Sequence, residues 1–277
     1  MTPLTSRSGR VKAARALRQR RDRAEQRLFL AEGVNAMTEA LAVGGVVEVF
    51  ATLEASEEYA ALRKAADEAG VPWQLADAHA VGSLSGTVTP QGIVAVCRFL
   101  DVELQQLLTP EVEQRPPATG QVAGPLVICA DVRDPGNAGT VVRTADAVGS
   151  AGIVLAGHSV DAYNDKTVRA TVGSLWHLPV ALHDDPADAV RRAQAAGFTV
   201  LAADGAGETD LFAAEESGLL TGRHAWLFGN EAWGLPEDLA ALADHRVSIP
   251  ILGRAESLNL ASAAAVCLYA DARQRSR

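Results

Sequence analysis

The fold of this chain is decided by one stretch of sequence, residues 131–143, which reads DVRDPGNAGTVVR. It follows a short apolar run and contains a Gly/Asn turn, a pattern typical of a buried strand that leads into a helix. Such a turn leaves free backbone N–H groups and a positive helix end at the edge of a sheet, where anionic groups bind. Arg143 lies six residues beyond Asn137, about one and two-thirds helical turns along. An ordinary N-cap at Asn137 and a surface arginine at position 143 explain the same residues equally well.

Two more clusters of this kind follow apolar runs later in the chain. Residues 227–236 read LFGNEAWGLP, where two glycines allow a ligand close to the backbone and Glu231 can orient polar groups. A plain turn explains this cluster almost as well. Residues 249–262 read IPILGRAESLNLAS, where Ser257 is expected to cap a helix. Asn259 needs a further reason, because asparagine is a poor helix former.

The C-terminal half alternates between strands and helices, which predicts an α/β domain with a largely parallel sheet over residues 125–277. Strands are expected near 126–131, 152–156, 198–203, 225–229 and 247–250. Helices are expected near 138–148, 165–174, 186–196, 236–242 and 258–272.

The N-terminal half predicts a second, smaller α/β domain over residues 28–100. Its strands are expected at 28–31, 46–51 and 93–98, and its helices near 33–43 and 56–69. Residues 101–124 lose this rhythm and gather proline and glycine, which indicates a linker between the two domains.

Charge is distributed unevenly along the chain. The formal net charge is −9, but residues 1–27 carry nine basic and two acidic side chains, a net charge of +7. An acidic body with a basic N-terminal arm suits contact with a polyanion, because arginine can bind phosphate with two hydrogen bonds. The alternative is a disordered or solvated helical arm with no partner.

The three clusters, in this order, resemble the three motifs of the SpoU (TrmH-type) RNA 2'-O-ribose methyltransferases. The resemblance rests on Asn137-x-Gly139-x-x-x-Arg143, on Gly229-Asn230-Glu231 with Gly234, and on Ser257-Leu258-Asn259, and it spans residues 125–272. Residues 32–41 and 91–96 also resemble the N-terminal RNA substrate-binding domain of this family. Together the two parts cover most of the chain.

This resemblance implies a trefoil knot at the carboxyl end of the C-terminal sheet, which holds S-adenosylmethionine. It also implies a homodimer, with the small-residue face of the last helix (Ala261, Ala264, Ala265, Leu268) at the interface, although packing inside one subunit explains that face equally well. The residues expected at the cofactor are Ala203, Asp204, Gly205, Gly229, Asn230, Glu231, Ile249, Ile251, Ser257 and Leu258.

The resemblance assigns catalysis to Arg143, with Asn137, Glu231 and Asn259 shaping the site. A guanidinium is a poor general base because it stays charged, so Arg143 is expected to stabilise the developing alkoxide or to grip a phosphate. The substrate implied is RNA, with 23S (large-subunit) rRNA favoured by the separate N-terminal domain and its basic arm. A tRNA methyltransferase and a catalytically inactive rRNA-binding protein stay open as alternatives. A dinucleotide-dependent oxidoreductase is disfavoured, because no GxGxxG follows the first strand of either domain.

No metal site, disulfide or membrane span is expected. Cys97, Cys129 and Cys267 sit among apolar neighbours without CxxC spacing, which indicates buried thiols. No apolar run approaches the roughly 20 residues of a membrane-spanning helix, and the N-terminus lacks the apolar stretch of a signal peptide. These features predict a cytoplasmic protein.

Overall fold

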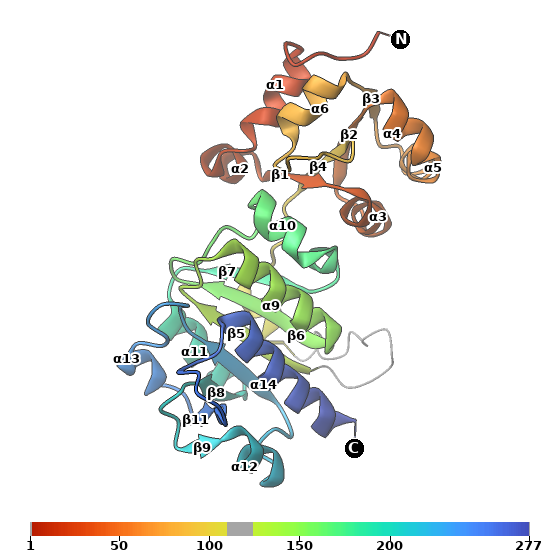
Figure 1. Ribbon diagram of the computed structural model, residues 1–277. Helices are drawn as coiled ribbons and strands as arrows, with labels where there is room; N and C mark the ends of the chain where they lie inside the picture. The colour runs from red at the N-terminus through yellow and green to blue at the C-terminus, as the bar shows by residue number, and fades with distance from the viewer. Residues whose placement is uncertain (1, 110–123, 277) are drawn as a thin grey trace. The chain divides into compact units, whose positions relative to one another are not determined.

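The computed structural model describes residues 2–109 and 124–276, and it divides the chain into two compact units (Figure 1). Unit 1 comprises the residues up to Leu100 together with the segment Asp161–Trp176. Unit 2 comprises Asp101–Val160 and the residues from His177 onward. Among the described residues, no helix is both long and apolar enough to cross a membrane.

Unit 1 is built on a four-stranded sheet in the order β1-β4-β2-β3. The central strand β4 (Ile93–Arg98) runs antiparallel to both β1 (Leu28–Glu32) and β2 (Val46–Ala51), while β3 (Trp73–Leu75) is parallel to β2. The predicted strands are confirmed within a residue, and β3 was not predicted because it is short and polar at its centre. The sheet is accompanied by α3 (Val34–Val43), α4 (Leu53–Glu58), α5 (Ala60–Glu68) and α6 (Ala78–Leu84).

The first 27 residues differ from the arm suggested by their charge. They form α1 (Gly9–Ala16) and α2 (Arg20–Gln26), and α1 with the residue after it buries Val11, Ala14 and Leu17 in the core of unit 1. These apolar residues recur every three positions, which places them on one side of the helix. The basic side chains between them therefore project from a folded domain.

The segment 161–176 lies within the SpoU-like half of the sequence but packs with unit 1. It holds α10 (Asp165–Thr171) and the short helix η1 (Ser174–Trp176). The Tyr163 ring stacks on Phe99 with centroids 3.8 Å apart, and its hydroxyl accepts a 2.7 Å hydrogen bond from the Leu100 N–H. The helix predicted near 165–174 exists, but these aromatic contacts assign it to the other compact unit.

Unit 2 contains a sheet in which seven strands pair in parallel, in the order β7-β6-β5-β10-β8-β11-β9. This confirms the predicted α/β class. The strands are β5 (Gly124–Ala130), β6 (Ser150–Ala156), β7 (Val180–His183), β8 (Thr199–Ala203), β9 (Thr209–Asp210), β10 (His224–Phe228) and β11 (His245–Ser248). Every residue of β5, β6 and β10 is buried, as expected for strands covered on both faces.

Several helices of unit 2 each follow one of its strands along the chain. They are α9 (Pro135–Ala147), α11 (Pro186–Ala195), α12 (Leu211–Glu216), α13 (Glu237–Ala240) and α14 (Leu260–Arg275). Helices α9 and α14 pack side by side over the sheet (Figure 1). Helix α11 packs against the face of the sheet that carries the Leu126 and Ile128 side chains of β5.

The predicted linker at 101–124 is partly wrong. Residues 101–109 belong to unit 2, where α7 (Leu104–Leu107) buries Leu104 and Leu107, and Leu108 joins them in the same core. The leucine spacing 104, 107, 108 was the signal of an amphipathic turn that the proline content obscured. Residues 110–123 of the predicted linker lie outside the described residues.

The three cysteines are buried, as predicted. Burial raises the pKa of the Cys97 and Cys129 thiols to about 12, because the apolar surroundings disfavour the thiolate. Within residues 2–109 and 124–276, no cluster of histidine, cysteine and acidic side chains has a metal-binding arrangement.

Candidate active site

The three sequence clusters meet at the carboxyl edge of the parallel sheet in unit 2. The first connects β5 to α9, the second follows β10, and the third connects β11 to α14. Helix α9 is capped by Asp134, whose carboxylate accepts a 2.8 Å hydrogen bond from the Asn137 N–H. Pro135 occupies the first turn of α9. Because Asp134 is the cap, the Asn137 side chain is free for other partners.

Glu231 receives three N–H donors from the first cluster. Its carboxylate accepts from the backbone N–H of Arg133 at 3.1 Å, from that of Asp134 at 3.0 Å and from the Asn137 side-chain amide at 3.2 Å. Burial acts to raise the pKa of Glu231, but these N–H donors together lower it below the usual value for a glutamate. Glu231 is therefore an ionised acceptor that ties the second cluster to the first.

Asn259 connects the third cluster to the same point. Its side-chain amide donates a 3.0 Å hydrogen bond to the Asn137 side-chain oxygen, while its own oxygen accepts from the Ala261 N–H at 2.9 Å. Asn259 is thus the N-cap of α14, and the expectation that Ser257 caps this helix is wrong, since the helix begins three residues later, at Leu260. We call the chain Glu231–Asn137–Asn259 the amide bridge.

Gly229 and Asn230 support the turn that carries Glu231. The Asn230 side chain is buried, donates to the Asp131 carbonyl at 2.7 Å and accepts from the Ala232 N–H at 2.8 Å. Asn230 and Gly234 also exchange two backbone hydrogen bonds of 2.9 Å. A Cβ at Gly229 would overlap the Gly234 backbone, so glycine is required here by close chain packing.

Arg143 is exposed on α9 and lies outside the amide bridge. Among the described residues it has no ion-pair or hydrogen-bond partner, so its guanidinium charge is available to a ligand. A six-residue separation turns it to another side of the helix from Asn137.

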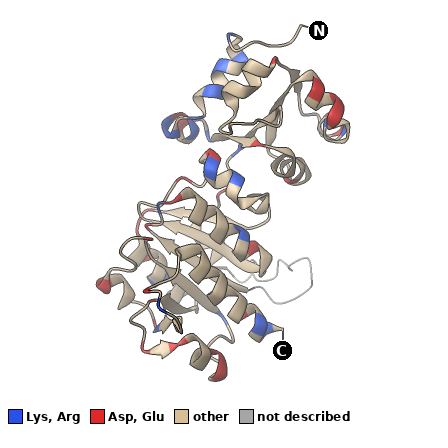
Figure 2. Cartoon of the chain, in the orientation of Figure 1, with Lys and Arg blue, Asp and Glu red and all other residues tan. Residues whose placement is uncertain are grey.

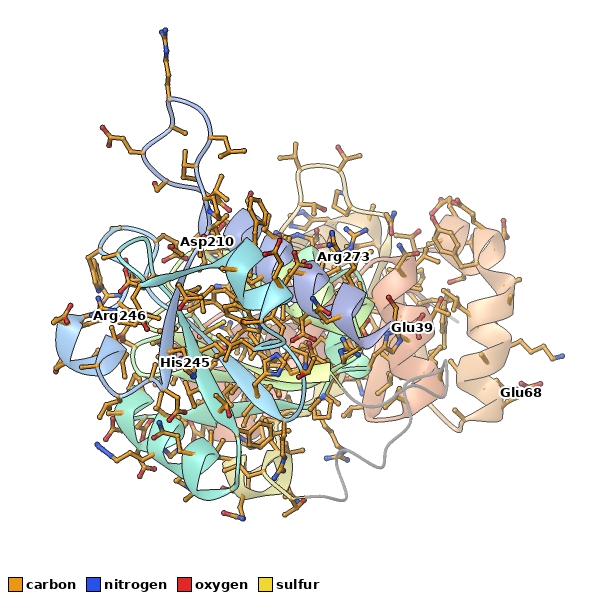
Figure 3. The ribbon with its side chains drawn as sticks, turned by 90° about the horizontal axis from the view of Figure 1, so that it is seen from below. Glu39, Glu68, Asp210, His245, Arg246 and Arg273 are labelled. Atoms are coloured by element: carbon orange, nitrogen blue, oxygen red, sulfur yellow. The ribbon has the colours of Figure 1, made fainter. Side chains whose placement is uncertain are left out.

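Of the residues expected at the cofactor, Asp204 is already paired. Its carboxylate binds the guanidinium of Arg246, the residue labelled in Figure 3, at 2.9 and 2.5 Å. Arg246 also contacts Glu237 at 2.7 Å. The hydrogen bonds that Arg246 donates to the Glu237 and Asp204 carboxylates raise the pKa of its guanidinium further. Sequence reasoning missed Arg246, because a single arginine in a strand has no signal. Gly205 next to this pair borders open space, where an added Cβ would meet no atom within 4 Å.

The segment that precedes Asn259 is exposed over residues 251–259 and extends away from the rest of unit 2 (Figure 3). Ile251, Leu252 and Leu258 are 37%, 89% and 39% exposed. Exposed apolar side chains of this kind can cover the apolar part of a ligand. Ile249 and Ser257 belong to the same connection, and Ala203 ends β8 near Gly205.

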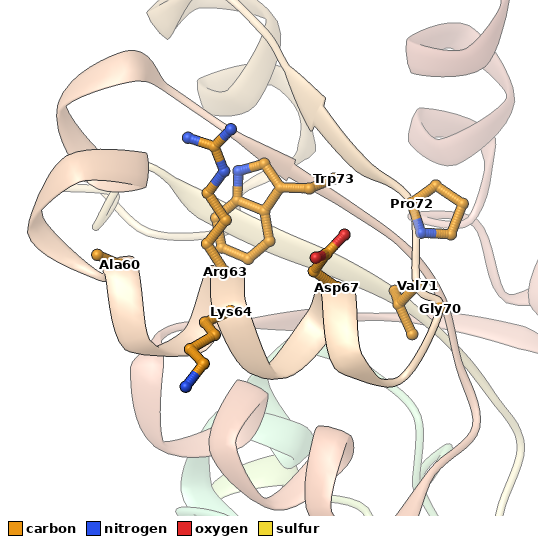
Figure 4. Close-up of a pocket in the computed structure, with 8 residues that line it drawn as sticks. All are labelled: Ala60, Arg63, Lys64, Asp67, Gly70, Val71, Pro72 and Trp73. Atoms are coloured by element: carbon orange, nitrogen blue, oxygen red, sulfur yellow. The ribbon is translucent and has the colours of Figure 1, made fainter.

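A further groove lies in unit 1, along α5 and β3 (Figure 4). It has a volume of about 630 Å³ and is lined by basic, acidic and apolar residues, among them Arg63, Asp67 and Trp73. None of the expected site residues lines this groove.

Comparisons with known proteins agree with the arrangement in both units. Residues 124–269 match the SpoU rRNA Methylase family, and residues 9–95 match the MRM3-like substrate binding domain. The chain is 29% identical over 267 residues to the 23S rRNA (guanosine(2553)-2'-O)-methyltransferase RlmP of Bacillus subtilis (strain 168), covering 96% of each chain.

Solved structures of high similarity include an AdoMet-bound rRNA methyltransferase from Sinorhizobium meliloti, with a TM-score of 0.81, 31% identity and coverage of 98% of this chain and 97% of that one. The SpoU methyltransferase AviRb from Streptomyces viridochromogenes, in complex with AdoMet, gives a TM-score of 0.81 at 29% identity, over 98% of this chain and 99% of that one. Because the family match covers more than half of the residues and the amide bridge joins all three motifs, the chain belongs to the SpoU rRNA methylase family.

Proposed function

We propose that this protein transfers a methyl group from S-adenosylmethionine to a ribose 2'-hydroxyl of RNA, with large-subunit rRNA as its substrate. The amide bridge carries the proposal, because it brings residues of three distant motifs into one hydrogen-bonded set at the start of α9, the helix that also carries Arg143. The names of the relatives support it: RlmP acts on 23S rRNA, and the Sinorhizobium protein was solved with AdoMet bound.

Asn137 is the residue that orients the substrate in this proposal. Its amide nitrogen donates to Glu231 and its oxygen accepts from Asn259, so the amide plane cannot flip without breaking both hydrogen bonds. One N–H and one oxygen lone pair stay available, and together they can hold a hydroxyl, which both donates and accepts. Glu231 and Asn259 act through Asn137 and are positioning residues.

Arg143 carries the charge that the reaction needs. A 2'-hydroxyl becomes a better nucleophile as it loses its proton, and a nearby guanidinium stabilises the developing negative oxygen or holds the adjacent phosphate. Because Arg143 stays protonated, the proton leaves to solvent or to that phosphate.

S-adenosylmethionine supplies an electrophilic methyl group on a sulfonium. We assign its binding to the open space at Gly205, to Ala203 at the end of β8, and to the apolar side chains of Ile251 and Leu258. Asp204 contributes by fixing Arg246, and Gly229 and Asn230 by fixing the turn of Glu231.

The charge pattern of unit 1 supports an RNA substrate. Exposed basic residues gather on α1, α2 and the residues around them, and acidic residues gather on α4 (Figure 2). Six of these exposed residues form what we call the basic face: Arg7, Arg10, Lys12, Arg18, Arg20 and Arg21. Phosphates are attracted to the basic face and repelled by the acidic one, so RNA is held in one orientation on the domain.

The test is transfer of labelled methyl groups to naked rRNA and to bulk tRNA in parallel, followed by digestion to nucleosides. We expect 2'-O-methylnucleosides from rRNA, and Arg143→Ala is expected to abolish transfer while leaving S-adenosylmethionine affinity unchanged. Arg191→Ala, at another exposed arginine in unit 2, is the matched control and should transfer normally. Label in tRNA alone would overturn the choice of substrate, and binding without transfer would indicate an inactive rRNA-binding protein.

We further propose a trefoil knot in unit 2, a homodimer and a cytoplasmic location, where rRNA is modified. The small-residue face expected at the dimer interface is packed within the subunit, since Ala261, Ala264 and Leu268 are buried. The exposed side of α14 instead presents Val266 and Tyr269. Sedimentation of the wild type and of Tyr269→Asp tests the dimer: a monomer in both cases would contradict it.

A further inference from the structure

One large aromatic side chain is exposed at the rim of the amide bridge. Trp233 is 53% exposed, and the Arg133 guanidinium lies over its ring, 5.2 Å from the ring centroid. An exposed pair of this kind stabilises a fold by only about 0.5–1 kcal/mol, so its contribution to folding is small. Exposed aromatic and arginine planes are, however, the groups on which unpaired nucleobases stack.

Both members of the pair are held by the residues that build the active site. Trp233 stands in the turn closed by the two hydrogen bonds between Asn230 and Gly234. Arg133 donates its backbone N–H to Glu231, which also receives the Asn137 amide. Glu231 is therefore the common neighbour of the pair and of the residue that orients the ribose. A base attached to a ribose at Asn137 is thus linked through one shared residue, Glu231, to a surface on which it can stack.

We propose that Trp233 and Arg133 form a platform on which the nucleobase of the target nucleotide, or of the nucleotide next to it, stacks in an unpaired RNA segment. This proposal rests on the proposed function. The indole offers to any base the face that Arg133 does not cover, and the guanidinium adds a positive charge that favours the electron-rich base and its phosphate. Stacking supplies affinity and orientation, and leaves recognition of the base edges to other groups.

The experiment compares Trp233→Ala with Trp233→Phe at saturating S-adenosylmethionine, with a 2'-O-methylatable rRNA fragment as the probe. Loss of one stacked base weakens binding by about 1–3 kcal/mol, which corresponds to roughly 5- to 150-fold. We expect Trp233→Ala to raise KM for RNA by at least about fivefold, with Trp233→Phe recovering most of the loss. Phe212→Ala, at an exposed aromatic residue on α12, is the matched control and should leave KM unchanged.

Two further measurements separate the outcomes. Calorimetric titration with S-adenosylmethionine should give the same Kd for Trp233→Ala and the wild type; a weakened Kd would show that the pair serves the cofactor and would overturn the proposal. RNA binding measured by anisotropy needs no catalysis: a wild type that binds but does not methylate refutes the proposed function, whereas equal RNA affinity of wild type and Trp233→Ala refutes the platform.

Discussion

At the scale of single residues, the site depends on an asparagine held at both ends. Asn137 lies 94 residues from Glu231, to which it donates a hydrogen bond, and 122 residues from Asn259, from which it accepts one. An asparagine in the first turn of a helix is unfavourable by propensity alone. Its presence is explained by these two bonds, which set the direction of an amide that the proposed reaction needs.

The charge of Glu231 should matter for both stability and activity. Glu231→Gln keeps the shape of the side chain but places an amide N–H among N–H donors, so we expect loss of methyl transfer. We also expect the free energy of unfolding to fall by only about 1 kcal/mol, because solvent screens this exposed group. Glu216→Gln, at an exposed glutamate of α12, is the control and should change neither.

The effect of Glu231 should also depend on pH. Its folded-state pKa lies below the usual 4.5, so the ionised form stabilises the fold above about pH 4.5 and this contribution is lost as the pH falls through the folded-state pKa. Urea unfolding of the wild type and Glu231→Gln, measured from pH 7 to 3, gives the free energy of unfolding of each protein. The difference between the two should stay constant near neutral pH and become smaller at the acid end. A difference that grows on acidification would contradict the hydrogen-bond assignment.

At the scale of elements, the turn between β10 and α13 is shaped by backbone packing. A Cβ at Gly229 would overlap the Gly234 and Leu235 backbones, which cannot move aside as a flexible side chain can. We therefore expect Gly229→Ala to lower the free energy of unfolding by about 1–3 kcal/mol. Gly205→Ala, which meets open space, should cost less than about 0.5 kcal/mol in the same urea titration. Equal values for both would show that the turn can relax.

The helices α1 and α2 should set the salt dependence of RNA binding. Replacing Arg18, Arg20 and Arg21 of the basic face by glutamine removes three exposed charges. The slope of log K against log salt should then fall by about 0.7–0.9 for each RNA phosphate that the variant no longer neutralises. The double variant Arg63→Gln/Lys64→Gln, on the acidic side of the domain, should keep the wild-type slope. If the two variants showed the same slope of log K against log salt, the basic face would not be part of the RNA-binding surface.

At the scale of the whole molecule, two parts distant in sequence form unit 1. Arg23 of α2 is buried and binds Asp161 with two nitrogens, at 2.9 and 2.6 Å. The segment 161–176, which follows a strand of unit 2 in the chain, is thereby part of the substrate-binding unit. The chain passes between the two units at three places, so unit 1 is joined to the methyltransferase half by more than one connection.

This arrangement predicts that Asp161 stabilises the N-terminal unit. Asp161→Asn leaves the Arg23 guanidinium buried without an opposite charge, which costs about 3–5 kcal/mol. Asp165→Asn, which removes an exposed ion pair with Arg169, should cost less than about 1 kcal/mol. Urea unfolding followed by circular dichroism, with each transition fitted separately, measures both. Similar shifts for the two variants would contradict the anchoring role of Asp161.

Local patterns in the sequence were sufficient for the α/β class, for most strands of the parallel sheet and for the three motifs. Strand and helix periodicity, glycine turns and caps act over a few residues, so they are visible without the fold. The same local logic misplaced the cap of α14, since Ser257 and Asn259 are both good caps, and in the structure Asn259 accepts from the Ala261 N–H and also donates to Asn137.

The remaining features were decided by the tertiary structure. The charge of residues 1–27 predicted an arm. In the structure Val11, Ala14 and Leu17 are buried, so residues 2–27 form part of a folded domain. Asp204 is paired with Arg246, 42 residues away, a partner that no pattern in the sequence indicated. Partners this far apart are chosen by the order of strands in the sheet, and that order depends on which apolar surfaces pack together, a property of the whole chain that no short pattern contains.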